Sequence, residues 1–221
     1  MYRSIAIDGP AGAGKSTVAR ALAQKLQLIY VDTGAMYRVL ALYCHDSGID
    51  IKDTAEVIKN VYKPSIRLEN SDKGQQIFLD GEDVTDLIRT NDIGNDASVV
   101  STYPEVRKRL VEMQQEIAAH HDVVMDGRDI GTVVMPDAYL KIFLTADPRE
   151  RAKRRVGELA AKGIEADIDE VEKEIKERDS RDANREVSPL RQADDAVLVD
   201  TTDMNVDEVV ETIIGIYRER L

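Results

Sequence analysis

The sequence predicts an α/β fold whose centre is a five-stranded parallel sheet flanked by helices. Two observations predict it: short, nearly continuous apolar runs alternate with helical patterns along the 221 residues, and a glycine-rich segment joins the first run to the first helix. Apolar runs of this kind are typical of strands that helices cover on both faces. The expected strands are residues 3–8, 29–32, 122–126, 139–145 and 196–200.

The glycine-rich segment, residues 9–16, reads G-x-x-x-x-G-K-S between the first strand and a helical pattern over residues 17–26. Its glycines let successive backbone N–H groups face a phosphate, and the positive end of the helix faces the same anion. Lys15 adds a charge for the β- and γ-phosphates, and the Ser16 hydroxyl suits Mg²⁺. The segment predicts a P-loop NTPase fold that binds nucleotide phosphates; a glycine-rich turn without a ligand is the alternative.

Two later helices are indicated by their first residues. Asp147 suits the N-cap position, and Pro148 suits the first turn. Glu150, three residues after Asp147, could accept a hydrogen bond from the N-cap backbone N–H, as in a capping box. Residues 102–105, from Thr102 to Glu105, show similar spacing. We expect a helix to begin at each place.

One stretch between the second and third expected strands breaks the alternation. Ile66 with Leu68, and Ile77 with Leu79, have a spacing of two, and the turn signal Asp80-Gly81 follows. This pattern predicts a small antiparallel sheet within an insertion of about residues 63–100. The alternative is an extension of the main sheet at its edge. The position of the insertion favours a separate lobe that covers a substrate.

Composition limits the remaining classes of function. The length and the 43% hydrophobic content suit one domain over residues 1–221, and the net charge of −12 argues against binding to nucleic acid. The single cysteine, Cys44, permits no intramolecular disulfide and suits a reducing compartment. With no signal core, no apolar span and no long heptad seam, we expect a cytoplasmic monomer without membrane contact.

Arginines gather in one part of this acidic chain. Eight of the eighteen lie between Arg149 and Arg191, which indicates a local anion site. On a helix, Arg178, Arg181, Asp182 and Arg185 would share one face and close over a polyphosphate. The alternative is a solvated helix end with pairs such as Glu174 with Arg178.

The segment D-G-R-D, residues 126–129, follows the third expected strand, at the sheet edge where α/β folds bind ligands. Asp126 suits a Mg²⁺-bound water, Arg128 a phosphate, and Asp129 a hydrogen bond from a base. A tight turn is the alternative interpretation.

Two further places attract attention. Residues 32–38 open a helix, running to about Tyr43, that could receive a second phosphate; plain capping by Asp32 or Thr33 is the alternative. Arg107 lies next to the apolar seam of its helix, so we expect its guanidinium group to be free at the edge of a groove. An ordinary surface arginine is the alternative.

Four ordered motifs, G-P-A-G-A-G-K-S-T, V-D-T-G-A-M-Y-R, D-G-R-D-I-G-T-V-V and K-E-R-D-S-R-D-A-N-R, resemble those of the bacterial cytidylate kinases over nearly the full chain. The resemblance implies transfer of the γ-phosphoryl group of ATP to CMP or dCMP, with Mg²⁺ and without a covalent protein intermediate. It also implies an enlarged lobe that binds the nucleoside monophosphate (NMP), formed by the insertion, and a helical lid over about residues 151–190.

The resemblance also implies roles for residues at matching positions. The expected ATP-binding residues are Gly9, Pro10, Ala11, Gly12, Ala13, Gly14, Lys15, Ser16, Thr17, Arg154 and Arg155. The expected CMP-binding residues are Thr33, Arg38, Ser98, Arg107, Arg128, Asp129, Arg178, Asp182 and Arg185. The expected catalytic residues are Lys15, Arg128, Arg181 and Arg185. Thr33 stands where relatives often carry serine, and both residues supply a hydroxyl group at this position.

Base chemistry supports the same acceptor independently. Cytosine offers a 4-amino donor where uracil offers a carbonyl, and a carboxylate such as Asp129 accepts from that amine. The rival functions are a P-loop kinase for another small molecule and a nucleotide-dependent switch. The chain lacks the N-K-x-D and D-x-x-G elements that a switch would carry.

Overall fold

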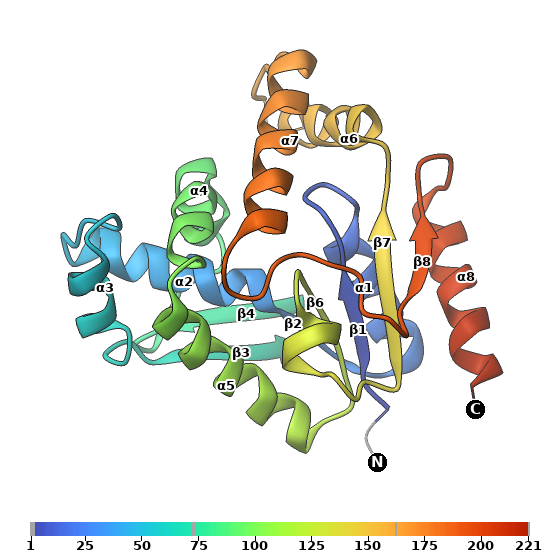
Figure 1. Ribbon diagram of the computed structural model, residues 1–221, viewed down its shortest axis with the longest axis horizontal. Helices are drawn as coiled ribbons and strands as arrows, with labels where there is room; N and C mark the ends of the chain where they lie inside the picture. Colours follow the sequence, from blue (N-terminus) through green and yellow to red (C-terminus); the bar gives the residue numbers. More distant parts are fainter. Residues whose placement is uncertain (1–2, 72–73, 162, 221) are drawn as a thin grey trace.

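The computed structural model describes residues 3–71, 74–161 and 163–220, and its centre is the predicted parallel sheet. The strands lie in the order β2-β6-β1-β7-β8 (Figure 1), and every pairing is parallel. Their bounds are β1 Ile5–Asp8, β2 Ile29–Asp32, β6 Val123–Gly127, β7 Leu140–Thr145 and β8 Val197–Asp200. The prediction of five parallel strands is confirmed, and each observed strand starts and ends within one or two residues of its expected bounds.

Helices cover both faces of this sheet because its side chains alternate between two apolar cores. Ile5 and Ile7 pack toward Val18 of α1 and Val209 of α8, while Ala6 packs on the other face in the core that contains Ile130. The helices are α1 Lys15–Leu26, α2 Thr33–Asp46, α3 Thr54–Asn60, α4 Asn91–Val100, α5 Pro104–His120, α6 Pro148–Ala160, α7 Ile168–Asn184 and α8 Val206–Glu219. A short 3₁₀ helix, η1 Leu87–Arg89, and a π turn, η2 Ile130–Val134, complete the described elements.

The insertion forms its own antiparallel sheet of β3 Ile66–Ser71, β4 Gly74–Leu79 and β5 Glu82–Asp83. The alternative, an extension of the main sheet, is wrong, although one side chain joins the two sheets. The Gln75 amide donates to the Tyr30 carbonyl at 2.5 Å and accepts from the Asp32 N–H at 3.0 Å, as a neighbouring strand would. The insertion is thus fixed to the edge of β2.

The predicted helix starts are confirmed with one correction. Asp147 caps α6 by accepting from the Arg149 N–H at 2.8 Å. Tyr103, not Thr102, precedes α5, because the Thr102 hydroxyl donates back to Val99 O at 2.8 Å and so belongs to the end of α4. Among the described residues, no helix has the length and apolar character needed to cross a membrane.

Helices α6 and α7 stand together beyond the carboxyl end of the sheet, toward which β7 and β8 point (Figure 1). Their contact with each other rests on a small apolar cluster of Ala152, Val171 and Ile175. That cluster is separate from the apolar cores of the sheet.

The chain leaves β1 through Gly9, which passes very close to β7. Its φ is 150°, and a Cβ atom there would lie 1.9 Å from the Leu144 carbonyl oxygen. Since that oxygen belongs to the backbone of a central strand, it cannot move aside cheaply. Glycine at this position is therefore required by the approach of the loop to the sheet.

We expect Gly9→Ala to lower the free energy of unfolding by about 3 kcal/mol or more, because the added methyl group collides with a fixed backbone oxygen. Gly157→Ala is the matched control, since nothing lies within 4 Å of the added atom in α6. Alanine there should be neutral or stabilising by about 1 kcal/mol. Urea unfolding of both variants measures the difference, and equal midpoints would contradict the argument.

Candidate functional site

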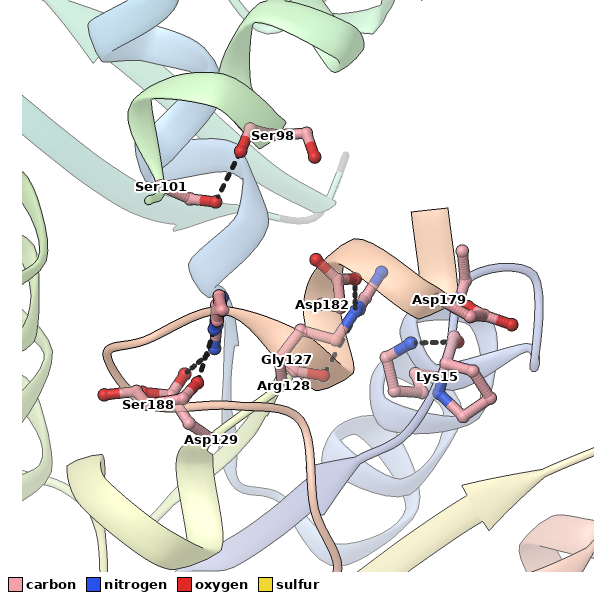
Figure 2. Close-up of polar contacts among 12 residues, drawn as sticks. Lys15, Ser98, Ser101, Gly127, Arg128, Asp129, Asp179, Asp182 and Ser188 are labelled. Atoms are coloured by element: carbon pink, nitrogen blue, oxygen red, sulfur yellow. Dashed lines mark hydrogen bonds and ion pairs between the residues drawn. The ribbon is translucent and has the colours of Figure 1, made fainter. Parts of the chain in front are cut away.

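The phosphate-binding loop between β1 and α1 holds its lysine inward. Gly12 and Gly14 have φ values of 74° and 86°, which glycine adopts without strain. Lys15 is buried, and its Nζ donates to the Pro10 carbonyl at 2.7 Å (Figure 2). Burial lowers the pKa of Lys15 well below its usual value, and the charge of Arg128 acts in the same direction. A polyanion would favour the charged form of this side chain.

Three oxygen-bearing side chains meet beside the loop. The Ser16 hydroxyl donates to Asp126 Oδ2 at 2.8 Å, and the Tyr30 hydroxyl donates to Asp126 Oδ1 at 2.9 Å. Burial raises the pKa of Asp126 to about 6, and the nearby Asp32 adds to the shift. In the described part of the chain, no group of three or more His, Cys, Asp or Glu side chains could hold a metal ion. Hydroxyl and carboxylate oxygens nevertheless fit Mg²⁺, which commonly keeps few protein ligands and uses phosphate oxygens for others.

Guanidinium groups gather at the carboxyl end of β6. Arg128 donates through Nε to Asp182 Oδ2 of α7 at 2.8 Å (Figure 2). Burial lowers the pKa of Arg178 to about 10, and the charge of Arg128 acts in the same direction. Burial also lowers the pKa of Arg38, to which the charge of Arg128 contributes. Arg128 differs, because burial opposes its charge but Asp182 holds its pKa above the usual value. Buried arginines gathered in this way are characteristic of an anion site.

Unpartnered donors mark the same place. Within the described residues, Arg178 Nε is buried without a hydrogen-bond partner. Arg185 Nη2 is buried in the same way, and the half-buried Arg38 makes no hydrogen bond or ion pair to the described residues. Because buried donors are nearly always satisfied, an acceptor from a ligand fits here.

Asp129 forms the centre of a second group of charged side chains, in which Asp129 and Arg107 are buried. It pairs with Arg107 Nη2, and its Oδ1 lies 3.6 Å from Arg185 Nη2. Arg107 is only 3% exposed and stacks over Tyr37, with 5.7 Å from its guanidinium carbon to the ring centre. The expectation that Arg107 has a free head at a groove edge is wrong, and so is the surface alternative. Tyr37 of α2 and Asp129 cover that flank of α5.

The predicted arginine face of α7 is only partly formed. The helix ends at Asn184, and Arg185 follows it with extended dihedrals of −64° and 144°. The expected helical spacing to Arg185 is therefore wrong, although the chain brings Arg185 to Asp129 by another path. Arg181 is exposed, while Arg178 and Asp182 face inward. The alternative pair of Glu174 with Arg178 does not form among the described residues.

The segment after β2 uses its polar groups internally. Asp32 Oδ1 caps α2 by accepting from the Ala35 N–H at 2.9 Å, so the capping interpretation is confirmed there. Thr33 is 3% exposed, and its hydroxyl donates to the Asp126 carbonyl at 2.7 Å. Ser98 lies half-buried on α4, where its carbonyl accepts from the Ser101 hydroxyl at 2.9 Å (Figure 2).

The two arginines of α6 that were expected near the donor nucleotide point in different directions. Arg154 donates to the Thr201 hydroxyl at 3.0 Å, at the carboxyl end of β8. Arg155 donates to Asn91 Oδ1 of α4 at 2.7 Å and so links α6 to the insertion. Of the two, only Arg154 therefore lies at the edge of the main sheet.

Several residues that touch the site escaped the sequence analysis. Asp8 accepts from the Ile130 N–H at 2.8 Å and the Gly131 N–H at 2.7 Å, which fixes the turn after Asp129 to the end of β1. The signal in the sequence that could have identified Asp8 was its position at the end of an apolar strand. Three more side chains lie here: Arg151 and Asp179 contact the loop, and Tyr30 contacts Asp126. Nothing in their spacing along the sequence distinguished them.

The chain matches the family model described as cytidylate kinase over residues 5–219. It is 49% identical over 216 residues to the cytidylate kinase of Shouchella clausii, covering 98% of this chain and 96% of that protein. It is 52% identical over 212 residues to the cytidylate kinase of Carboxydothermus hydrogenoformans, covering 96% of each.

Solved structures show the same fold at low identity. An uncharacterised protein from Eubacterium ventriosum has a TM-score of 0.56 and 14% identity, covering 99% of each chain. A gluconokinase from Sinorhizobium meliloti has a TM-score of 0.51 and 16% identity, covering 98% of this chain and 91% of that one. The predicted fold class is confirmed.

We expect the Asp8 carboxyl to give stability a measurable pH dependence. Burial raises its pKa from 3.8 to about 6, despite hydrogen bonds from Gly131 and Ile130. The folded state then holds the proton more tightly than the unfolded state, so this contribution is complete below pH 4 and is lost as the pH rises to about 6. The free energy of unfolding of the wild type minus that of Asp8→Asn should fall across this window. A constant difference would contradict the shift.

Proposed function

This chain belongs to the cytidylate kinase family, and we propose that it transfers the γ-phosphoryl group of ATP to CMP or dCMP, giving ADP and CDP or dCDP. One observation carries the proposal. The parallel register of β1 with β6 pairs Asp8 with Gly127, so the phosphate-binding loop and Arg128 begin side by side at one sheet edge. A donor on the loop and an acceptor at the arginines would meet there.

On the donor side, the backbone N–H groups of residues 9–17 would surround the ATP phosphates, and Lys15 would supply positive charge. A polyphosphate offsets the repulsion between Lys15 and Arg128, which supports binding at this position. Arg154, held at Thr201, lies at the same edge of the sheet and suits the nucleoside end of the donor. Arg155 is proposed to reach the donor from the lid.

Mg²⁺ is the cofactor that we propose with ATP. Ser16 and Asp126 would hold it, the carboxylate through a water molecule, and their oxygens already lie 2.8 Å apart. When bound, the ion neutralises charge on the phosphate oxygens and orients them. Tyr30 keeps the other Asp126 oxygen occupied.

On the acceptor side, Arg38, Arg128, Arg178 and Arg185 are proposed to bind the CMP phosphate and the group in transfer. No general base is required, because the acceptor phosphate is already an anion and positioning with charge neutralisation carries the rate. Asp182 orients Arg128 through its 2.8 Å bond and suits the ribose. Arg181 is exposed on α7, three residues after Arg178, and is proposed to join the phosphates when the lid closes over the substrates.

Base recognition is assigned to the buried group around Asp129. Its carboxylate would accept from the cytosine 4-amino group, and Arg107 would donate to the N3 and O2 edge. Ser98 of α4 is proposed to complete this pocket, and Thr33 of α2 is proposed to contribute to CMP binding elsewhere in the acceptor site. Arg107 pairs with Asp129 Oδ2, whereas Oδ1 lies 3.6 Å from Arg185 Nη2, beyond hydrogen-bond distance, which leaves Oδ1 as an acceptor for the amine.

The remaining assignments follow from the same chemistry. We propose a single domain, with residues of about 63–100 as the NMP-binding lobe and about 151–190 as the lid. Its partners would be small nucleotides, since the net charge is −12, and we propose a monomer. Cys44 is a buried free thiol, which suits the cytoplasm.

An acceptor panel tests the proposed function. The purified protein is given ATP and Mg²⁺ with CMP, dCMP, UMP, AMP, dTMP or shikimate, and ADP release is followed by a coupled assay. We expect CMP and dCMP to give the highest kcat/KM, with CDP or dCDP identified as the product. Absence of CDP would refute the proposal.

We expect Asp129→Asn to weaken the preference for CMP over UMP by about tenfold, because an amide can donate to the uracil carbonyl as well as accept. The Kd for ADP, measured by calorimetry, should stay unchanged. Asp137→Asn is the control, an exposed aspartate in the connection between β6 and β7. If the CMP to UMP ratio of kcat/KM matches that of the control, Asp129 does not read the base.

A further inference from the structure

We propose that Asp179 and Arg151 form a clamp that fixes the lid helix α7 on the phosphate-binding loop and so aligns the donor with the acceptor arginines. The inference rests on the proposed function for its catalytic consequence. Asp179 lies within the fourth motif, residues 176–185, but neither Asp179 nor Arg151 is among the residues expected to contact ATP or CMP. Both are positioning residues, since they act through the loop and the helix.

The clamp binds both the backbone N–H and the backbone carbonyl of Ala11 in the loop. Asp179 Oδ1 accepts from the Ala11 N–H at 3.1 Å, while Arg151 Nη1 donates to the Ala11 carbonyl at 2.8 Å. The two side chains are joined to each other, with 2.6 Å from Arg151 Nη1 to Asp179 Oδ2. Figure 2 shows Asp179 on α7 beside the loop that carries Lys15. One carboxylate therefore holds a loop amide and a guanidinium at once.

Arg151 is itself held firmly. Its side chain is 5% exposed, and its Nε donates to the Ala146 carbonyl, before the start of α6, at 2.9 Å. A Cβ atom at Gly12 would lie 3.3 Å from Arg151 Cβ and 3.8 Å from Ile175 Cδ1, so the crest of the loop packs against both lid helices. In such a site, removal of either charge leaves its buried partner uncompensated.

The part of α7 around Asp179 also carries one proposed acceptor arginine, Arg178, and contacts another, Arg128. Arg178 precedes Asp179, and Asp182, one turn later, binds Arg128 at 2.8 Å. Fixing Asp179 on the loop consequently fixes where Arg178 and Asp182 lie relative to the donor phosphates. This is the geometric reason to expect an effect on the rate of transfer as well as on donor binding.

Polar contacts matter here because the lid helices have little apolar attachment. Their apolar cluster of Ala152, Val171 and Ile175 is separate from the cores of the sheet. The hydrogen bonds of Asp179 and Arg151 to the loop therefore carry much of the attachment of α7. A local element held in this way is free to move when those bonds break.

The test compares Asp179→Ala, Asp179→Asn, Arg151→Met and the double variant Asp179→Ala with Arg151→Met. Controls are Glu177→Ala, an exposed acid on α7, and Lys153→Ala, an exposed base on α6. The Kd for ADP is measured by calorimetry, kcat and KM for CMP by the coupled assay, and folding by thermal unfolding. All assays are run well below the lowest unfolding temperature.

We expect Asp179→Ala to raise the Kd for ADP about tenfold and to lower kcat about tenfold, since charge-assisted hydrogen bonds are lost. The KM for CMP should change less than threefold, because Asp182 keeps its bond to Arg128. Asp179→Asn keeps the size of the side chain and an acceptor for Ala11, so it should be affected less. The double variant should resemble the single variants, because partners in one clamp are not additive.

Three results would overturn the clamp. These are a Kd for ADP and a kcat equal to those of the controls, additive effects in the double variant, or a lower unfolding temperature with unchanged ADP binding. The Kd for ADP needs no acceptor, so it tests the clamp even if the wild type fails to phosphorylate CMP. That failure would refute only the proposed function.

Discussion

The in-register pairing of β1 with β6 is the constraint on which the site depends. Hydrogen bonds between these parallel strands place Asp8 beside Gly127, so their outgoing segments start at the same edge of the sheet. Gly9 permits the first segment to pass over β7, and Asp8 ties the second to the first through two backbone N–H groups. A shift in register would separate the phosphate-binding loop from Arg128.

Around this edge, the chain balances buried charges of both signs. Asp182 pairs with Arg128, and Asp129 lies between Arg107 and Arg185, which lowers the cost of removing these groups from water. The balance is incomplete at Arg178, whose pKa is lowered by burial and then by Arg128. An acidic protein thus buries several arginines beside carboxylates and leaves Arg178 Nε without a hydrogen-bond partner among the described residues.

Much of the fold was predictable because its signals are local. Apolar runs identified every strand of the main sheet, and the spacing of Ile66, Leu68, Ile77 and Leu79 identified the small sheet. Site residues were less predictable where the packing of distant segments decides the environment. Arg107 was expected at a surface and is buried, because α2 and the start of η2 cover it. Arg185 was placed on a helix that ends one residue before it.

The sequence by itself determined the fold class, the phosphate-binding loop and the ordered motifs, because each depends on residue type and spacing along a continuous stretch. Tertiary structure alone decided which polar side chains touch that loop. Arg151 and Asp179 contact Ala11 of the loop, and Tyr30 contacts Asp126 beside it. These residues come from separate elements, and only the packing of β2, α6 and α7 at the sheet edge brings them there. Contacts between distant segments leave no periodic signal in a single chain, since each partner satisfies only its own local pattern.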